Sequence, residues 1–243
     1  MKWQVGETTI TKIEEIVFPE FSDVIPAATP EMVKKVKWLF PDFVTEEGML
    51  KLSIHSLIVE TPTAKLIVDT CIGNEQDRNP FEVMHMLSTS YMEDMKAAGY
   101  HPDQIDYVLC THLHLDHVGW NTYLKDGKWV PTFPNASYMF SKQDLEFWGA
   151  ASADDENEFM QIQNRVFADS LQPILDAGLA KPIEGPAKVC EGVSLVPTPG
   201  HTPGHCSVLI ESKGESAMIT GDFIHHPIQF WDPELVSPFD VDN

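Results

Sequence analysis

The stretch THLHLDHVGW, residues 111–120, crowds three histidines and one aspartate into six positions. The apolar run IDYVLCT leads into it and predicts a short buried strand. At a strand end alternate residues face one side, so His112 and His114 can reach one metal ion while the leucines between them point into the core. Asp116 and His117 are displaced from that pair and suit a second, adjacent ion, and a glycine just beyond lets the chain turn.

Further ligands are expected from other loops at the same edge of the fold. His201 lies in the Pro/Gly-rich turn PTPGHTPGH (197–205), and it is the predicted third ligand of the first metal. Asp222 follows the apolar run SAMIT, where a carboxylate can bridge two cations. Asp69 ends the run AKLIVD, where it can orient a ligating histidine or act as a turn residue. His205 is expected to support the site or the local structure rather than to bind metal.

The rest of the chain alternates between predicted strands and predicted helices, which is typical of sheets covered by helices in layers. Two hairpins are expected, one from KLSIHSLIVE and AKLIVDT and one from CSVLIES and SAMITGD, with further strands at ASYMFS and VSLVPTPG. Helices are predicted over residues 81–99, ending at a glycine, from residue 142 onward, and over residues 156–175.

Residues 18–44 break this pattern by mixing prolines with aromatic residues. Pro30 can open a short helix through about Leu39. The segment is consistent with a flap over the active site, with a separate hydrophobic cluster, or with the interface of a homodimer. The aromatic candidates for a substrate pocket are Phe21, Trp38, Phe40 and Trp120, and each of them suits a core role equally well.

Composition narrows the classes of partner. The formal net charge is −21, with 16 basic against 37 acidic residues, so a nucleic-acid backbone would be repelled. No apolar run approaches the roughly 20 residues that a membrane helix needs. The four cysteines are scattered, and the first residues lack the apolar core of a signal peptide. We therefore expect a cytoplasmic protein that acts on a small molecule, with no nucleic-acid or membrane partner.

The motifs VDT with Asp69, HLHLDH at 112–117, PGHTPGH around His201 and GD at 221–222 resemble, in order and spacing, those of the metallo-β-lactamase fold superfamily. The resemblance spans about residues 50–225. It implies an α/β fold, a four-layer αβ/βα sandwich with the metals at one edge of the sheets. It also implies that His112, His114 and His201 bind one metal, that Asp116 and His117 bind the other, and that Asp222 bridges them.

We expect residues 1–243 to form a single domain of this type, with the aromatic insertion at about 18–44. That insertion and the helical segment before His201 resemble the lactonase, esterase and organophosphate-hydrolase branch. One departure concerns the last ligand, because family members usually supply a final histidine to the second metal from a loop well beyond the bridging aspartate. Here the last histidines, His225 and His226, follow Asp222 closely.

Three interpretations of this departure stay open. The natural chain continues past Asn243 with its C-terminal elements and a final histidine, or His225 or His226 substitutes for that ligand, or one metal suffices. If they are not ligands, His225 and His226 are expected to line the pocket or to support the ligands.

The ligand set predicts a hydrolase that uses two divalent ions. Zinc is the ion expected first, because it favours histidine nitrogen and carboxylate oxygen as ligands. A metal-bound hydroxide would attack a small ester or lactone, or a β-lactam or phosphotriester, and Asp116 would accept its proton. The alternatives are a mononuclear iron oxygenase of the persulfide-dioxygenase kind, using His112, His201 and Asp222, a nuclease, and an inactive truncated module that binds metal weakly. The sequence does not identify the substrate, and His/Asp sites accept several divalent ions.

Overall fold

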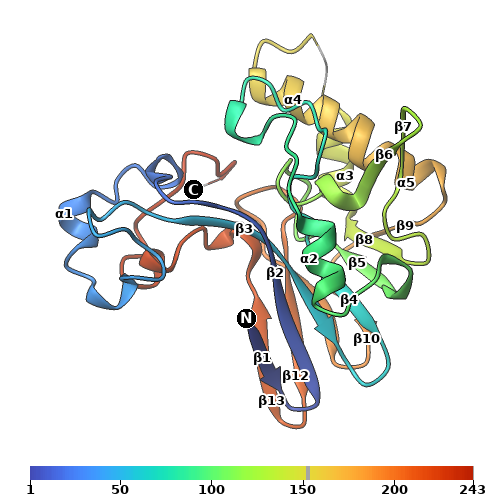
Figure 1. The fold of residues 1–243 in the computed structure, drawn as a ribbon, viewed down its shortest axis with the longest axis horizontal. Coiled ribbons are helices and arrows are strands. Elements are labelled where there is room, and N and C mark those ends of the chain that lie inside the picture. Colours follow the sequence, from blue (N-terminus) through green and yellow to red (C-terminus); the bar gives the residue numbers. More distant parts are fainter. Residues whose placement is uncertain (152–153, 243) are drawn as a thin grey trace.

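The computed structural model describes residues 1–151 and 154–242 (Figure 1). Its strands are β1 (Lys2–Val5), β2 (Thr8–Phe18), β3 (Leu52–Glu60), β4 (Lys65–Val68), β5 (Tyr107–Leu109), β6 (Thr122–Lys125), β7 (Lys128–Pro131), β8 (Ser137–Ser141), β9 (Ala180–Ile183), β10 (Ala187–Cys190), β11 (Val193–Pro197), β12 (Cys206–Ser212) and β13 (Glu215–Ile219). The α-helices are α1 (Pro30–Val33), α2 (Tyr91–Ala97), α3 (Lys142–Gly149), α4 (Glu158–Val166) and α5 (Gln172–Asp176).

The strands form two main sheets. The larger sheet has the order β1-β2-β3-β4-β5-β8-β9, antiparallel from β1 to β4 and parallel from β4 to β9. The smaller sheet, β10-β11-β12-β13, is antiparallel, and β6 and β7 form a separate ribbon. Both predicted hairpins, β3–β4 and β12–β13, are confirmed.

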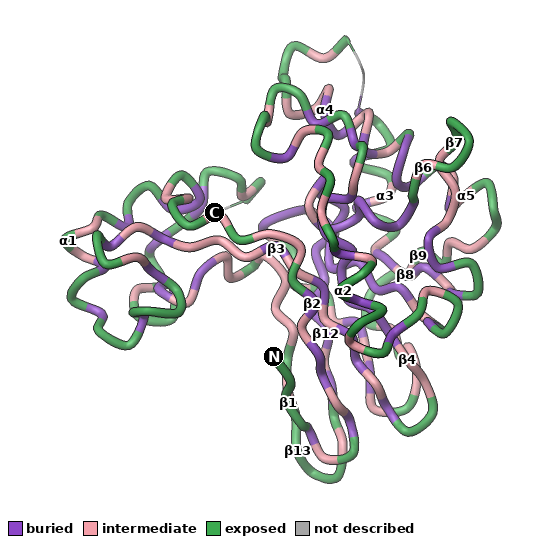
Figure 2. The backbone as a smooth tube through the Cα atoms, in the orientation of Figure 1, coloured by how far each residue is buried: buried purple, intermediate pink, exposed green. Residues whose placement is uncertain are grey.

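The central strands β4 and β5 of the larger sheet are buried on both faces, which explains their nearly continuous apolar runs (Figure 2). Along β3, Ile54 and Ile58 belong to the buried cluster that contains Met95 of α2, whereas Val59 belongs to the cluster that contains Val208 of the smaller sheet. Residues of α2, α3, α4 and α5 all pack in the first of these clusters. The predicted α/β sandwich is therefore confirmed, and these four helices cover the outer face of the larger sheet (Figure 1).

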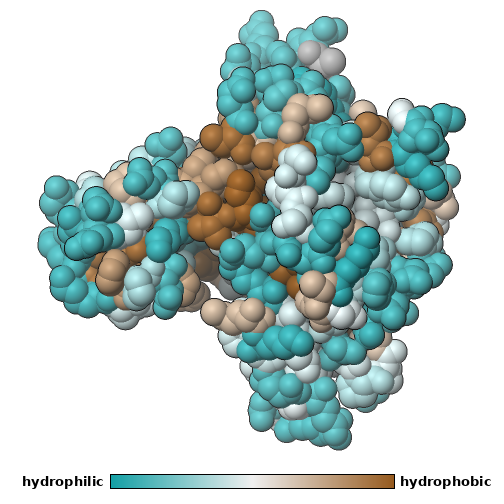
Figure 3. Space-filling model, viewed as in Figure 1, coloured by the Kyte–Doolittle hydropathy of each residue, from teal (hydrophilic) through white to brown (hydrophobic). Residues whose placement is uncertain are grey.

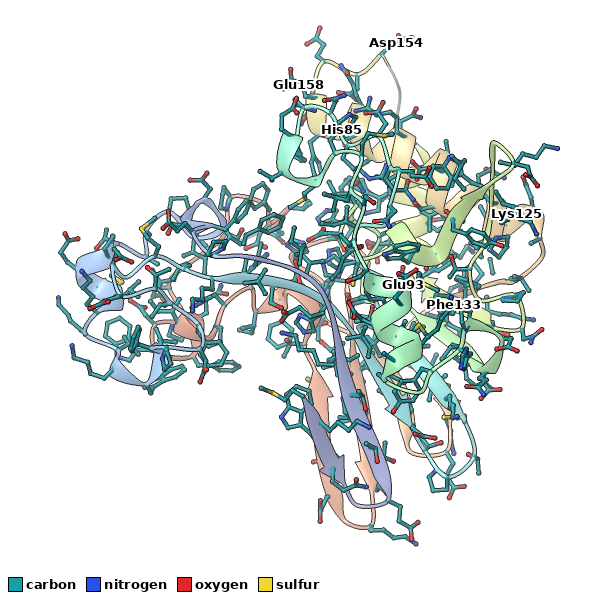
Figure 4. All side chains as sticks on the ribbon, in the orientation of Figure 1. His85, Glu93, Lys125, Phe133, Asp154 and Glu158 are labelled. Atoms are coloured by element: carbon teal, nitrogen blue, oxygen red, sulfur yellow. The ribbon has the colours of Figure 1, made fainter. Side chains whose placement is uncertain are left out.

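Helices α3 and α4 begin where the sequence supplies a capping side chain. Ser141 accepts a hydrogen bond from the backbone N–H of Gln143 at the start of α3, and Asn157 accepts one from Phe159 at the start of α4. Glu158 is exposed in the first turn of α4, where a negative charge is favourable (Figure 4). A π-helical turn (Phe167–Leu171) joins α4 to α5, so the helical stretch predicted over 156–175 is confirmed.

The helix predicted over residues 81–99 is wrong for its first half. A 3-10 turn (Glu82–Met84) is followed by irregular chain, and α2 begins only at Tyr91. The intervening backbone pairs with the loop after β4 instead of with itself. The Asn74 side chain bonds both the N–H and the C=O of Thr89, at 2.8 and 3.0 Å, and Met86 has a positive φ of 49°. Apolar spacing alone did not indicate this competing partner.

Residues 18–51, called the arm below, project from the sandwich (Figure 1). They have a buried cluster of their own, in which Ile25, Val33 and Leu39 pack with Ile228 and Leu235 from the end of the chain. The helix predicted from Pro30 to about Leu39 is broken into α1 and a 3-10 turn (Lys37–Leu39). None of the helices in the described part of the chain is long and apolar enough to cross a membrane.

Candidate metal centre

The loop after β5 carries the histidine-rich motif. The sequence analysis placed His112 and His114 at the end of a strand. In the structure β5 ends at Leu109, so both histidines lie in irregular chain beyond it. The alternation nevertheless holds, because Leu113 and Leu115 are buried in the core beneath the larger sheet. These two side chains anchor the loop and leave the imidazoles on its other side.

Three histidines from two loops converge on one point. The Nδ1 atom of His114 lies 3.1 Å from Nε2 of His112 and 2.9 Å from Nε2 of His201. Ligand nitrogens of a tetrahedral zinc ion lie about 3.3 Å apart, so these atoms are close to the spacing of a coordinated trio. Burial lowers the pKa of His112 and of His114 well below the ordinary value, and neighbouring histidines add to the effect. Both rings are therefore neutral and keep a lone pair for a metal.

A second group of side chains adjoins this trio. The Oδ2 atom of Asp222 lies 3.4 Å from Nε2 of His117 and 3.8 Å from Nε2 of His201. The Oδ2 atom of Asp116 lies 3.6 Å from the same nitrogen of His117. One carboxylate oxygen of Asp222 thus faces both groups, which is the position of a bridging ligand.

The charge balance of the second group fits a cation. Burial opposes protonation of His117, but the carboxylates of Asp222, Asp116 and Asp69 outweigh it and raise its pKa well above the usual value. Within residues 1–151 and 154–242, no lysine or arginine forms an ion pair with these three carboxylates. The neutral imidazoles of His112 and His114, and a cluster of carboxylates without a lysine or arginine partner, fit divalent ions such as zinc.

Asp69 fixes the position of His117 in the second group of ligand candidates. Its carboxylate accepts hydrogen bonds from the backbone N–H and the hydroxyl of Thr111, at 2.7 and 2.8 Å, and from Nδ1 of His117 at 2.9 Å. With the proton on Nδ1, Nε2 of His117 faces Asp222. The arrangement is the one expected of a carboxylate that orients a ligating histidine.

His205 contacts the backbone rather than the converging ligand atoms. Its Nε2 accepts a hydrogen bond from the backbone N–H of Asp222 at 3.0 Å, and its Nδ1 donates to the Thr198 carbonyl at 3.1 Å. Gly221 packs against it so closely that a Cβ there would lie 2.6 Å from Nε2 of His205. His205 therefore fixes the turn that presents Asp222.

The two histidines near the end of the chain behave differently. Nε2 of His226 donates to the Phe43 carbonyl at 2.9 Å, and its Nδ1 accepts from the N–H of Ile228, so this ring joins the end of the chain to the arm. His225 faces the site, with Nε2 4.0 Å from Oδ2 of Asp222. Of the two, only His225 lies within reach of the second group.

Two carboxylates that the sequence analysis passed over support the site. Oδ1 of Asp240 lies 2.7 Å from Nδ1 of His201. The half-buried Glu15 accepts hydrogen bonds from the N–H of Ile72 at 2.7 Å and from Nε1 of Trp120 at 2.6 Å. Neither residue lies in a recognisable motif, because both act on residues that are distant in the sequence.

A cavity of about 780 Å³ opens beside the ligands. Its lining includes His114, Asp116, His117, His201, Asp222 and His225. It also includes apolar side chains from the arm, the start of β3, the loop before α2, α4 and the end of the chain: Phe21, Leu52, Phe81, Met84, Phe159 and Phe239. In Figure 3, hydrophobic surface gathers in the hollow where the arm meets the sandwich. The site therefore combines a polar base with apolar walls.

Only one of the four predicted pocket aromatics, Phe21, lines this cavity. Trp120 is buried in the core, where it stacks on Tyr91 with ring centroids 5.6 Å apart. Trp38 and Phe40 are each 54% exposed on the arm and lie outside the cavity lining, contrary to the prediction. An aromatic-rich segment gave no signal for which of its faces would meet the site.

Comparisons with known proteins agree with this geometry. A family model described as the metallo-beta-lactamase superfamily matches residues 50–243. The N-acyl homoserine lactonase AiiA of Bacillus thuringiensis subsp. kurstaki is 28% identical over 209 residues, which are 81% of this chain and 74% of that protein. A probable metallo-hydrolase of Mycobacterium bovis is 26% identical over 195 residues, 73% of this chain and 58% of that protein.

Two solved structures are similar over nearly the whole chain. The hydrolase AbOPH of the beta-lactamase superfamily has a TM-score of 0.77 and 26% identity, and covers 99% of this chain and 80% of its own. AidC, a dizinc quorum-quenching lactonase solved in complex with a product, has a TM-score of 0.74 and 25% identity, and covers 100% of this chain and 81% of its own. With the family match over residues 50–243, the chain belongs to the metallo-beta-lactamase superfamily.

Proposed function

We propose that this chain is a two-metal hydrolase that opens the ring of N-acyl homoserine lactones, with zinc as the metal. The observation that carries the proposal is the juxtaposition of the two ligand groups with the apolar cavity. In this assignment His112, His114 and His201 hold one ion, Asp116 and His117 hold the other, and Asp222 bridges them. The names of the lactonase relatives support the choice of substrate class.

Two bound divalent ions would lower the pKa of a water molecule and polarise a carbonyl oxygen. The residues around them have separate tasks. Asp116 lines the cavity, and its Oδ2 atom lies 3.6 Å from Nε2 of His117. It can accept a proton at a carboxylate oxygen and return it to the leaving alkoxide oxygen, which becomes the hydroxyl of the opened lactone.

The cavity favours an uncharged substrate with an apolar tail. Its charged lining residues in the described part of the chain are acidic, and neither lysine nor arginine lines it. An anionic substrate, such as a β-lactam with its carboxylate or a nucleic acid, would find no lysine or arginine among these lining residues to pair with. An acyl chain gains about 0.8 kcal/mol for each methylene that it buries against such walls.

A one-metal oxygenase is supported less well by the same residues. It would use His112, His201 and Asp222, and it would leave the paired contacts of His117 with Asp116 and Asp69 without a role. Those contacts form the second ligand group. Hydrolysis with two ions uses every member of the cluster.

Substitution of the ligands tests the proposal. His112→Ala and Asp222→Asn are expected to abolish hydrolysis of N-hexanoyl homoserine lactone, which is measured by the release of acid. Both variants should retain the circular dichroism spectrum of the wild type. His101→Ala, at an exposed histidine, is the matched control and should leave the rate unchanged. Retained hydrolysis in both ligand variants would show that the site is assigned wrongly.

A further inference from the structure

We propose that Asp240 is a positioning residue for His201, and that its carboxylate fixes the ring tautomer in which Nε2 is free to bind the first metal. The inference rests on the proposed two-metal site. Asp240 lies near the end of the chain and contacts Nδ1 of His201, which is not the nitrogen that faces the other ligand candidates.

The contact is short and lies on the far side of the ring. Nδ1 of His201 lies 2.7 Å from Oδ1 of Asp240, whereas Nε2 of the same ring faces Nδ1 of His114 at 2.9 Å. His201 is 4% exposed, so water does not compete freely for either nitrogen. An ionised carboxylate offers acceptors only, so Nδ1 must carry the proton and Nε2 must present its lone pair.

The backbone around Asp240 is fastened to the same turn. The N–H of Val241 donates to the carbonyl of His201 at 3.1 Å, and the N–H of Asp242 donates to the carbonyl of Gly200 at 3.0 Å. The other carboxylate oxygen of Asp240 accepts from the N–H of Ser237 at 3.3 Å. The carboxylate is thus held in register with the ring that it orients.

Without Asp240, the remaining partner of the ring would be ambiguous. Nε2 of His225 lies 3.2 Å from Nδ1 of His201, and a histidine nitrogen can either donate or accept. If His225 donated, the proton of His201 would move to Nε2 and block the metal-binding lone pair. Asp69 removes the same ambiguity for His117, so the two histidines have equivalent supports on opposite sides of the site.

A third cation held by His201, His225 and Asp240 is the competing explanation, because these three side chains also cluster. The distance of 2.7 Å is that of a charge-assisted hydrogen bond. Ligand atoms bound to one zinc ion at about 2.1 Å lie roughly 3 Å or more apart. The geometry therefore favours the hydrogen bond, and a metal count separates the two.

The test compares Asp240→Ala and Asp240→Asn with Asp242→Asn, an exposed carboxylate two residues away that loses the same charge. Zinc affinity of the whole chain is measured by competition with a chromophoric chelator. The His201 Nδ1–H proton is followed by NMR in the zinc-loaded protein. We expect Asp240→Ala to weaken zinc binding by about 10–100-fold and to lose the slowly exchanging Nδ1–H signal.

The zinc affinity of Asp240→Asn should lie between that of Asp240→Ala and that of the wild type, because its amide oxygen still accepts the hydrogen bond. This variant replaces Asp240→Ala in the test if Asp240→Ala fails to fold. Asp242→Asn should match the wild type. Unchanged zinc affinity and an unchanged Nδ1–H signal in both Asp240 variants would overturn the inference, and so would the loss of a third bound zinc ion. If zinc affinity depended on Asp240 as expected but the wild-type chain hydrolysed no lactone, the proposed function would be overturned and this inference would stand.

Discussion

Asp222 presents Oδ2 to Nε2 of His117 at 3.4 Å, although the two residues belong to loops that follow different sheets. His117 follows β5 of the larger sheet, and Asp222 follows β13 of the smaller one. The carboxylate therefore joins the two halves of the sandwich at the point where both groups of ligands meet. Its substitution should separate metal binding from folding.

Asp222→Asn is expected to remove one equivalent of tightly bound zinc and to lower kcat/KM for lactone hydrolysis by more than about 100-fold, above the usual effect of supporting residues. The neutral amide cannot balance two cations. Inductively coupled plasma mass spectrometry gives the metal content, and Asp232→Asn, outside the site, is the control. Two retained zinc equivalents would contradict the bridging role.

The wall of the cavity should decide the preference for acyl chain length. Phe21→Ala removes apolar surface from the lining, so KM for N-decanoyl homoserine lactone should rise about 10-fold and KM for the N-butanoyl substrate should rise less. Phe40→Ala, on the exposed face of the arm, should change neither value. Equal effects of Phe21→Ala on both substrates would place the acyl chain elsewhere.

The buried ion pair between Arg78 and Asp169 should stabilise the contact between the loop before α2 and the π-helical turn. Arg78 is fully buried and donates to both carboxylate oxygens, at 2.8 and 3.2 Å. Arg78→Met leaves an unpaired buried carboxylate, which typically costs about 3–5 kcal/mol of the free energy of unfolding. Urea denaturation measures the loss, and Arg165→Met, at a more exposed arginine, should cost under about 1 kcal/mol.

His55 should contribute to the pH dependence of stability. Burial, and secondarily the charge of Lys12, lowers the pKa of His55 from 6.5 to about 4 in the folded protein. Between these two pH values His55 is protonated in the unfolded chain and neutral in the folded one. The free energy of unfolding therefore falls as the pH drops from about 6.5 towards about 4. His55→Gln should lose less stability than the wild type between pH 7 and pH 5 in urea denaturation, whereas His101→Gln should follow the wild type. Identical slopes for the wild type and His55→Gln would show that this ring is not held neutral.

The sequence predicted the parts of the fold that depend on local pattern. Apolar runs identified both hairpins, and apolar spacing identified the helices after residue 141. The failures have a common cause in partners that are distant in the sequence. Asn74 binds the backbone of Thr89 outside the helix, which shortens the helix predicted over 81–99, and Asp240 and Glu15 act on residues far along the chain. Neither the spacing of a motif nor its apolar period contains that information.

At the site, the sequence predicted which ligand candidates would come together. It did not predict which aromatic side chains would face the cavity. The ligand candidates converge because each follows a strand at one edge of the sandwich. Trp38 and Phe40 share a segment with Phe21, yet only Phe21 turns toward the cavity, because the arm buries its aliphatic residues in a cluster of its own. The direction of the arm depends on Ile228 and Leu235, which lie almost 200 residues away in the sequence.

The most direct test of the account is a zinc titration of activity. The protein is stripped of metal with a chelator and reloaded with defined equivalents of zinc, and hydrolysis of N-decanoyl homoserine lactone is measured at each step. We predict that the stripped protein is inactive and that the rate rises until two equivalents are bound. Full activity in the stripped protein, or none with two equivalents bound, would contradict the two-metal lactonase proposed here.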